Sequence, residues 1–223
     1  MNQEQALSLL KETKLVAILR GIPVKQATDI ATALYDGGVR VLEFTFDHDD
    51  PDCVAHNCQR IRAVKKIFGD EMVVGCGTAL TVQEVEASVE AGGQIVISPN
   101  VDVSVIAKTK ALGAISMPGA LTPTEIVMAY NAGADIVKLF PAGTLGVPYI
   151  KAVRGPLGYI PMSAVGGVRP ETIADFLNVG VCGFGVGGEL VKKEFVRSGD
   201  MNALTSRARE FVHAIEQWGA NRS

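Results

Sequence analysis

The sequence has no long apolar run and no marked excess of charge, and these absences exclude two classes of protein. No stretch approaches the ~18–20 apolar residues of a transmembrane helix, and the start "MNQEQALSLLKETK" has neither part of a signal peptide. The 21 basic and 24 acidic residues leave a formal net charge of −3. This balance gives no electrostatic reason to expect nucleic acid or an anionic membrane as a partner. We therefore expect a cytoplasmic protein.

Cysteine is scarce too, with four residues in the chain and no pair spaced as CxxC. Cys76 and Cys182 lie in apolar, strand-like stretches. A chain of this size in a reducing compartment rarely carries disulfides. None of the three histidines shows a pairing with a cysteine in the sequence, as a nucleophilic thiol would require. We expect reduced, structural thiols.

Linkers and low-complexity tracts are absent as well, so the 223 residues are predicted to form a single domain over residues 1–223. Short β-rich runs alternate with longer amphipathic segments. The predicted strands span residues 15–19, 39–46, 72–77, 94–98, 114–117, 135–140, 159–165 and 182–186. The predicted helices between them span residues 24–36, 52–67, 81–91, 102–112, 122–131, 147–154 and 169–179.

Regular alternation of strand and helix predicts a parallel sheet, and about eight such units predict an α/β fold of the closed (β/α)8 or TIM-barrel type. A short N-terminal helix over residues 2–12 and a C-terminal helix over residues 200–218 would be additions to the barrel. A doubly wound open sheet is the competing fold. It is less favoured because the first strand is followed by "RGIP" rather than by a GxGxxG turn.

A lysine interrupts an otherwise apolar strand, "DIVKLF". If Lys138 points into the barrel, alternation also directs Ile136 and Phe140 inward. Val137 and Leu139 would then face the helices. Burial disfavours the charged form of an ammonium group and so lowers its pKa. A partly neutral lysine is a nucleophile that can form a Schiff base with a ketone.

Three other strands carry a polar side chain that can reach the same space. The inward sets that alternation predicts are Val16, Ile18 and Arg20 on the first strand, Val39, Val41, Glu43 and Thr45 on the second, and Val74, Cys76 and Thr78 on the third. The polar members lie at or near the C-terminal strand ends, where barrel enzymes keep their sites. Glu43 could act as a general base beside Lys138, or the two could form a buried ion pair without chemistry.

Glycine-rich segments follow the last two predicted strands, "VGGVRP" at residues 165–170 and "GVGGEL" at residues 185–190. Adjacent glycines let backbone N–H groups approach an anion, and the loops at these positions of a barrel are a frequent phosphate site. The alternative is that the glycines only permit tight turns. Glu189 would repel a phosphate unless its side chain points away.

An acidic segment, "FDHDDPD", follows the second strand. Its carboxylates and imidazole could bind a divalent metal ion, and the members of this cluster are Asp47, His48, Asp49, Asp50 and Asp52. Clustered carboxylates in a loop are more often solvated. "DP" also fits a helix start with Asp50 as N-cap.

Several segments together resemble one family. They are "LVAILRGI", "GGVRVLEFTF", "VGCGTALT", "IVISPN", "MPGALTPTE", "GADIVKLFPA", "SAVGGVRPETI" and "GFGVGGELV", and they cover roughly residues 14–195 in the order of that family. The chain resembles the 2-keto-3-deoxy-6-phosphogluconate/4-hydroxy-2-oxoglutarate (KDPG/KHG) aldolases. The resemblance implies a class I aldolase that forms pyruvate and an aldehyde from a 2-keto-3-deoxy-6-phospho-sugar acid or from 4-hydroxy-2-oxoglutarate.

The same resemblance implies roles for individual residues. Lys138 would be the Schiff-base lysine and Glu43 the general acid and base. The substrate-binding residues implied are Arg20 at the carboxylate, Thr78 at the pyruvate end, Pro99, Phe140, Gly166, Gly167, Gly187 and Gly188. No cofactor or metal is implied, because the imine takes the place of a Lewis acid. The family also suggests a homotrimer.

This chain departs from the family pattern at three positions near the site. Asp47 stands where many relatives have an arginine, Val165 where many have a threonine, and Gly188 where many have a serine that helps hold phosphate. Loss of both hydroxyls, with Glu189 nearby, weakens the case for a phosphorylated substrate. The "AVGGV" segment resembles the 6-phosphogalactonate branch. The alternatives to a class I aldolase are a metal-dependent sugar-phosphate aldolase or epimerase and a non-catalytic barrel that binds a metabolite.

Overall fold

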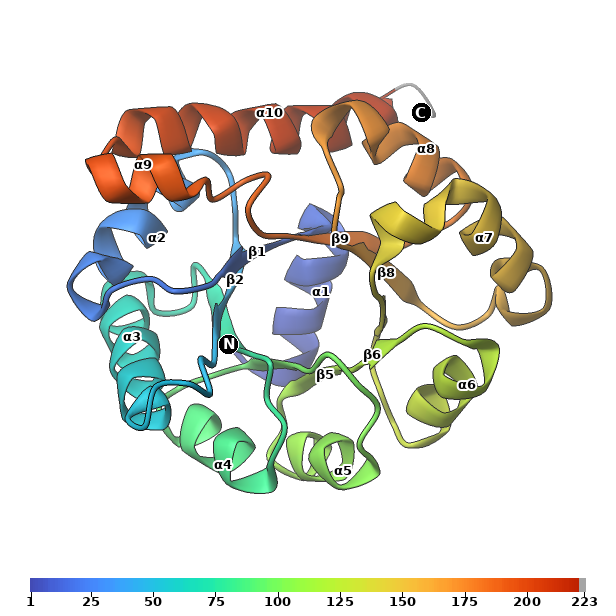
Figure 1. Ribbon diagram of the computed structural model, residues 1–223, viewed down its shortest axis with the longest axis horizontal. Coiled ribbons are helices and arrows are strands. Elements are labelled where there is room, and N and C mark those ends of the chain that lie inside the picture. Colours follow the sequence, from blue (N-terminus) through green and yellow to red (C-terminus); the bar gives the residue numbers. More distant parts are fainter. Residues whose placement is uncertain (221–223) are drawn as a thin grey trace.

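The computed structural model describes residues 1–220 and shows a parallel sheet closed into a barrel with helices around it (Figure 1). In this part of the chain the sheet order is β5-β4-β3-β2-β1-β9-β8-β7-β6. The strands are β1 Leu15–Leu19, β2 Val41–Thr45, β3 Val73–Gly77, β4 Ile95–Ile97, β5 Ile115–Met117, β6 Gly119–Ala120, β7 Val137–Leu139, β8 Met162–Val165 and β9 Gly183–Val186.

The segments β5 and β6 are one strand interrupted at Pro118. Its first part pairs with β4 and its second part pairs with β7, so the strand joins the two ends of the sheet. Pro118 has no N–H to donate, but its carbonyl accepts a hydrogen bond from the Lys138 N–H at 2.8 Å. Counted in this way the sheet has the eight strands of the predicted (β/α)8 barrel, and that prediction is confirmed.

The helices lie outside the barrel except for the first (Figure 1). They are α1 Gln3–Thr13, α2 Ala27–Asp36, α3 Cys53–Phe68, α4 Val82–Glu90, α5 Val103–Ala111, α6 Pro123–Asn131, α7 Ala142–Leu157, α8 Ile173–Asn178, α9 Lys193–Ser198 and α10 Met201–Ala220. Short 3-10 turns at Val24–Gln26 and Pro170–Thr172 precede α2 and α8. The predicted boundaries are close to these. The six-residue α9 was not predicted, and α7 begins earlier than predicted and bends at Gly146.

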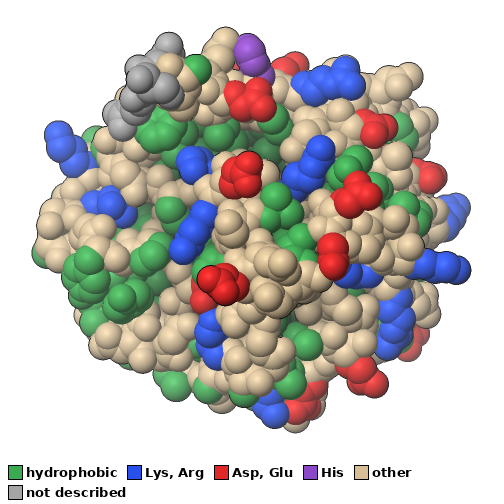
Figure 2. Space-filling view, turned by 180° about the vertical axis from the view of Figure 1, so that it is seen from behind, with side chains coloured by type: hydrophobic (Ala, Val, Ile, Leu, Met, Phe, Trp, Pro, Cys, Tyr) green, Lys and Arg blue, Asp and Glu red, His purple; other side chains and the backbone are tan. Residues whose placement is uncertain are grey.

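Two apolar layers hold the barrel together. The larger packs the outer faces of the strands against the surrounding helices, and the smaller fills the barrel interior. Ala6 and Leu10 of α1 belong to the inner layer, and therefore α1 closes the N-terminal end of the barrel. Figure 2 shows this side of the molecule, where charges of both signs are interspersed with apolar side chains. Within residues 1–220 no helix is both long and apolar enough to cross a bilayer.

The inward and outward faces agree with the predicted alternation on most strands, with two exceptions. Val39 lies in the outer layer, because β2 and its alternation begin only at Val41. On β3 the prediction is wrong: Val74 and Cys76 face the helices, and Val73 lies in the inner layer. Thr78 does not share the parity of Val73, because it lies beyond the strand and its φ of +56 breaks the alternation.

Candidate active site

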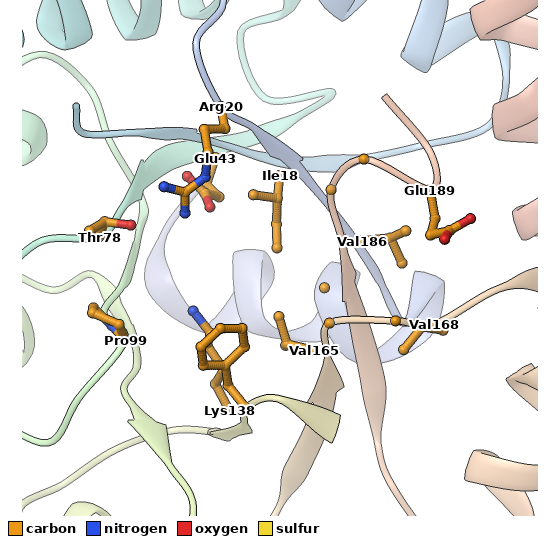
Figure 3. A pocket seen from close by; sticks show the side chains of 16 residues that line it. Ile18, Arg20, Glu43, Thr78, Pro99, Lys138, Val165, Val168, Val186 and Glu189 are labelled. Carbon is orange, nitrogen blue, oxygen red and sulfur yellow. The ribbon is translucent and has the colours of Figure 1, made fainter. Parts of the chain in front are cut away.

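A cavity of about 220 Å³ opens at the C-terminal ends of the strands (Figure 3). It gathers residues from five strands, β1, β2, β7, β8 and β9, and from loops that include those after β3 and β4. Each residue that the sequence proposed for catalysis or substrate binding lines it, namely Arg20, Glu43, Thr78, Pro99, Lys138, Phe140, Gly166, Gly167, Gly187 and Gly188. The structure brings them together at one end of the barrel.

Lys138 extends from β7 into this cavity. Its side chain is buried, with 8 % of its surface exposed, and its Nζ lies 5.0 Å from the centroid of the Phe140 ring. Burial lowers the pKa of Lys138, opposed by the attraction of Glu43 and assisted by the positive charge of Arg20. The side chain therefore lies in surroundings that favour the neutral, nucleophilic amine.

Glu43 extends from β2 toward the same space and is 2 % exposed. Thr45, two residues along the strand, donates its hydroxyl to the carboxylate at 3.2–3.3 Å. Burial raises the pKa of Glu43 to about 7, although Lys138, the Thr45 hydroxyl and Arg20 each act in the opposite direction. A carboxyl group with this pKa can both accept and donate a proton near neutral pH.

Lys138 and Glu43 face each other across the cavity without a direct contact (Figure 3). The Lys138 Nζ and the Glu43 carboxylate oxygens lie farther apart than the 4.0 Å that defines an ion pair. The two residues therefore do not form a buried salt bridge in this structure. Two titratable groups with pKa values shifted toward neutrality, separated by an open space, form an arrangement typical of active sites. The cavity between them can hold a substrate carbonyl.

Glycines with no side chain to project inward make room for these groups. A Cβ on Gly77 would lie 2.1–2.2 Å from the carboxylate atoms of Glu43, and a Cβ on Gly185 would lie 2.9 Å from Cγ2 of Val165. The sequence motifs assigned no role to Gly77, and they placed Gly185 only in the glycine-rich segment 185–190. The available signal was a small residue at an inward position near the end of a strand, where the barrel otherwise places a branched side chain.

Arg20 and Thr78 reach the cavity from loops rather than from strands. Arg20 is the first residue after β1 and Thr78 the first after β3. The left-handed conformation of Thr78, φ +56, is rare for a β-branched residue and redirects its side chain (Figure 3). In Figure 3 the Arg20 guanidinium lies beside Glu43, where it can meet an anionic group of a ligand.

The glycine-rich loop after β8, within residues 165–170, lines the cavity and also packs against a helix. Gly166 and Gly167 have φ +90 and +71, and the Gly166 carbonyl accepts the N–H of Gly143 at 2.7 Å. A Cβ on Gly143 would approach Cα of Gly167 to 2.8 Å. The loop after β8 thus lies directly against the first turn of α7, and a larger residue on either side would separate them.

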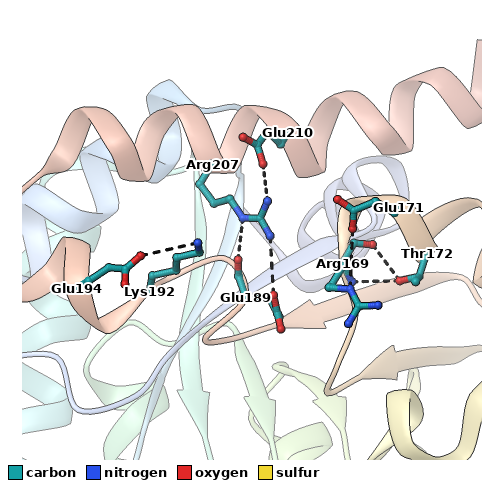
Figure 4. Close-up of polar contacts among 8 residues, drawn as sticks. All are labelled: Arg169, Glu171, Thr172, Glu189, Lys192, Glu194, Arg207 and Glu210. Carbon is teal, nitrogen blue, oxygen red and sulfur yellow. Dashed lines mark hydrogen bonds and ion pairs between the residues drawn. The ribbon is translucent and has the colours of Figure 1, made fainter.

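Glu189 lies at the rim of the cavity with its carboxylate directed away from Lys138 (Figure 3). Arg207 of α10 holds it there: its Nε donates to the Glu189 carbonyl at 2.8 Å, and its Nη2 lies 3.8 Å from the carboxylate (Figure 4). Arg207 also contacts Glu210. The negative charge of Glu189 is therefore partly neutralised and turned outward.

The acidic segment after β2 forms pairs rather than one cluster. His48 Nε2 lies 2.7 Å from Glu84 Oε1, and His56 Nδ1 lies 2.7 Å from Asp50 Oδ2. Among the described residues no three such side chains converge as a metal site would require. Asp50 is not the N-cap of α3, since Asp52 occupies that position.

The fold and this cavity define a class, the (β/α)8-barrel enzymes whose reactive groups lie at the C-terminal ends of the strands. Within that class, the family model described as KDPG and KHG aldolase matches residues 7–207. The chain belongs to the KDPG and KHG aldolase family. It is thus a pyruvate-dependent class I aldolase and a carbon–carbon lyase, as the sequence motifs predicted.

Individual relatives support this assignment. The chain is 37% identical over 182 residues, 81% of this chain and 83% of the relative, to a probable 2-dehydro-3-deoxy-6-phosphogalactonate aldolase of Rhizobium meliloti (strain 1021). It is 33% identical over 216 residues, 95% of this chain and 96% of the relative, to the KHG/KDPG aldolase of Escherichia coli (strain K12). A solved structure described as native KDPGal covers 92% of this chain and 96% of its own, with a TM-score of 0.83 and 32% identity.

Proposed function

We propose that this aldolase cleaves a 4-hydroxy-2-oxo acid to pyruvate and an aldehyde through a Schiff base on Lys138, with Glu43 as the proton carrier. The observation that carries the proposal is the pair of buried groups facing each other across the cavity, Lys138 with its pKa lowered and Glu43 with its pKa raised to about 7. No metal or cofactor enters the reaction as proposed.

The reaction begins when the neutral amine of Lys138 adds to C2 of the substrate. The carbonyl oxygen leaves as water after accepting a proton from the protonated Glu43, and a protonated imine and the Glu43 carboxylate result. The Glu43 carboxylate, directly or through a water molecule, removes the proton of the C4 hydroxyl. The C3–C4 bond breaks, its electrons move into the imine to form an enamine, and the aldehyde departs. Glu43 then returns its proton to C3, and hydrolysis of the imine releases pyruvate and regenerates Lys138.

Arg20 is proposed to bind the substrate carboxylate, and Thr78, Pro99 and Phe140 to line the pyruvate end. A guanidinium can bind a carboxylate with two parallel hydrogen bonds. Arg20 would act without a second arginine, because Asp47 stands where many relatives have one. All of these side chains except Asp47 line the cavity with Lys138.

The distal end of the substrate is proposed to lie at the glycine exits, formed by Gly166, Gly167, Gly187 and Gly188. We propose a 2-keto-3-deoxy-6-phospho-sugar acid of the gluconate or galactonate type, or 4-hydroxy-2-oxoglutarate. Relatives named for phosphogalactonate and for KHG/KDPG both fall within the matched family. The outward direction of Glu189 removes one objection to a phosphate at this end.

We further propose that the enzyme acts in the cytoplasm as a homotrimer. All four cysteines are free thiols, which suits a reducing compartment. The proposal of three subunits follows from the family, and light scattering on the purified protein should give three times the mass of one chain.

The experiment that tests the function is a pyruvate-release assay with phosphorylated and unphosphorylated 4-hydroxy-2-oxo acids, in wild type and two variants. Lys138→Ala should abolish turnover and Glu43→Gln should slow it by about 10²–10⁴-fold. Full activity in either variant would contradict the assigned roles. Activity that EDTA abolishes would instead support a metal-dependent aldolase, and binding without turnover a non-catalytic barrel.

A further inference from the structure

A second cavity of about 260 Å³ lies beside the first and shares Arg20 with it. It is formed where the loop after β1 meets the loop after β9 and helix α9. Its apolar residues are Ile22, Val191 and Val196, which are 4–7 % exposed. The volume is below that of a typical drug-sized pocket and suits a small polar group with a short carbon chain.

The charged residues that line this cavity all carry positive charge. They are Arg20, Lys193 and Arg197, each with an exposed side chain, and no acidic residue lines the cavity. Among the described residues none of these three cations has an ion-pair partner within 4.0 Å. Arg20 also interacts with the Glu43 carboxylate, so Lys193 and Arg197 supply the uncompensated positive charge around this cavity, which creates a local potential that attracts an anion.

The nearby acidic residues are occupied by other cations (Figure 4). Glu194 lies 3.7 Å from Lys192, and both Glu189 and Glu210 contact Arg207. Acidic residues therefore neutralise the charges of Lys192 and Arg207 in this region. Lys193 and Arg197 have no such partner and can contact a ligand. A general surplus of positive charge does not explain this pattern, because the net charge of the chain is −3.

We propose that the cavity bounded by Arg20, Lys193 and Arg197 binds the phosphate group of a small metabolite next to the catalytic cavity. Phosphate suits the site because it carries nearly two negative charges and can accept hydrogen bonds from several donors at once. Gly21 lines the cavity without a side chain, and a Cβ there would meet nothing within 4 Å. Arg20 links the site to catalysis because one side chain lines both cavities.

Binding is tested first without any catalytic assay, so the result does not depend on the proposed function. Inorganic phosphate is titrated into the ¹⁵N-labelled full-length protein while amide NMR shifts are followed. We expect shifts at Gly21, Ile22 and Val191, and about tenfold weaker binding in the double variant Lys193→Ala/Arg197→Ala. The matched control is Lys192→Ala, which removes a neighbouring cation that does not line the cavity and should leave the affinity within about twofold.

Two results would overturn the proposal. One is the absence of phosphate-dependent shifts at Gly21, Ile22 and Val191. The other is phosphate binding that the double variant leaves unchanged, with shifts confined to the glycine exits at Gly166, Gly167, Gly187 and Gly188. The double variant alters exposed side chains and the control alters a half-buried one at the surface, so circular dichroism and thermal unfolding of both should match wild type.

A kinetic comparison, which rests on the proposed function, distinguishes two sources of the phosphate. If the phosphate belongs to the substrate, its distal end lies in this cavity in place of the glycine exits, and the double variant raises KM more for a phosphorylated than for an unphosphorylated 2-oxo acid. If it belongs to a separate effector, added inorganic phosphate changes KM for the unphosphorylated acid in wild type, and the double variant loses that response. Failure of turnover with every substrate would contradict the proposed function while leaving the NMR result valid.

Discussion

At the scale of single residues, burial governs the protonation of Lys138 and Glu43. Because burial disfavours the charged carboxylate, ionisation of Glu43 lowers the free energy of unfolding, and this loss depends on pH. Its pKa of about 7 in the folded chain lies above the ordinary value of 4.5. A raised folded-state pKa contributes stability that is fully present below pH 4.5 and is lost as pH rises through about 7.

We therefore predict that Glu43→Gln stabilises the protein at pH 8 but not at pH 4. Glutamine has nearly the same shape and no charge to desolvate, and the free energy of unfolding should increase at pH 8 by roughly 1–3 kcal/mol. Urea denaturation at the two pH values measures the difference. The exposed Glu90 provides the control, since Glu90→Gln should have little effect at either pH. Equal stability of Glu43→Gln and wild type at pH 8 would show that Glu43 has no raised pKa.

At the scale of strands and loops, the position of Glu43 depends on two glycines of the neighbouring strand β3, which leave room for its side chain. Glu43 on β2 is opposite Gly75 on β3 in the sheet register, and its carboxylate extends to the space beside Gly77. Gly77→Ala would place a methyl group 2.1–2.2 Å from the carboxylate atoms, so the carboxylate must move.

We predict that Gly77→Ala lowers kcat on the order of 100-fold, because a displaced general base loses most of its effect. Gly155→Ala is the matched control, since a Cβ at Gly155 in α7 meets nothing within 4 Å. Steady-state assays of both variants, with circular dichroism to establish folding, measure the effect. Wild-type kcat in a folded Gly77→Ala protein would mean that Glu43 does not act from its observed position.

The contact of α10 with the loop after β9 gives a second prediction at this scale. In Arg207→Ala the Glu189 carboxylate loses its partner, and the added negative potential should raise KM for a phosphorylated substrate by about 3–10-fold. The double variant Arg207→Ala/Glu189→Gln should recover most of the loss, because the repelling charge is gone. If the double variant is as impaired as the single one, Arg207 acts through packing instead.

Secondary structure was largely predictable because glycine and proline mark the turns. Gly38 and Gly180, for example, follow the ends of α2 and α8 with positive φ, and Pro123 begins α6. The inward face of β3 was not predictable from Thr78, because the backbone leaves the strand at that residue. The α9 helix was missed because a six-residue helix carries too little periodicity.

The predicted site residues converge on one cavity because strand parity and the family motifs agree for Lys138, Glu43 and Arg20. The sequence did not predict which residues leave the cavity open between these side chains. Gly77 and Gly185 become important only when the sheet places Gly77 beside the Glu43 carboxylate and Gly185 opposite Val165. The partnership of Glu189 with Arg207 was equally hidden, since 18 residues and a helix separate them in the chain.

At the scale of the whole molecule, the barrel has two ends with different tasks. The C-terminal end holds the cavity, while the N-terminal end is closed by α1 (Figure 1). Leu10, 4 % exposed, packs there with Val16 and Val41 of the inner layer. Substitutions at the N-terminal end of the barrel should therefore change the free energy of unfolding without changing kcat or KM.

We predict that Leu10→Ala lowers the free energy of unfolding by about 2–4 kcal/mol, as expected for a leucine removed from a packed core. Its kcat and KM should stay at wild-type values at temperatures where the variant is folded. Ser8→Ala, at an exposed position of the same helix, is the control and should alter neither quantity. A large loss of kcat in folded Leu10→Ala would indicate that the two ends are coupled.

The most direct test of the central claim is chemical trapping of the enzyme with pyruvate and borohydride. The neutral amine of Lys138 should form an imine with pyruvate, and reduction should fix it as a stable adduct. Mass spectrometry of the digested protein should then find the reduced pyruvyl group on the peptide that contains Lys138, and no adduct in Lys138→Ala. An adduct on another lysine, or turnover with no adduct at all, would contradict a Schiff-base mechanism at this residue.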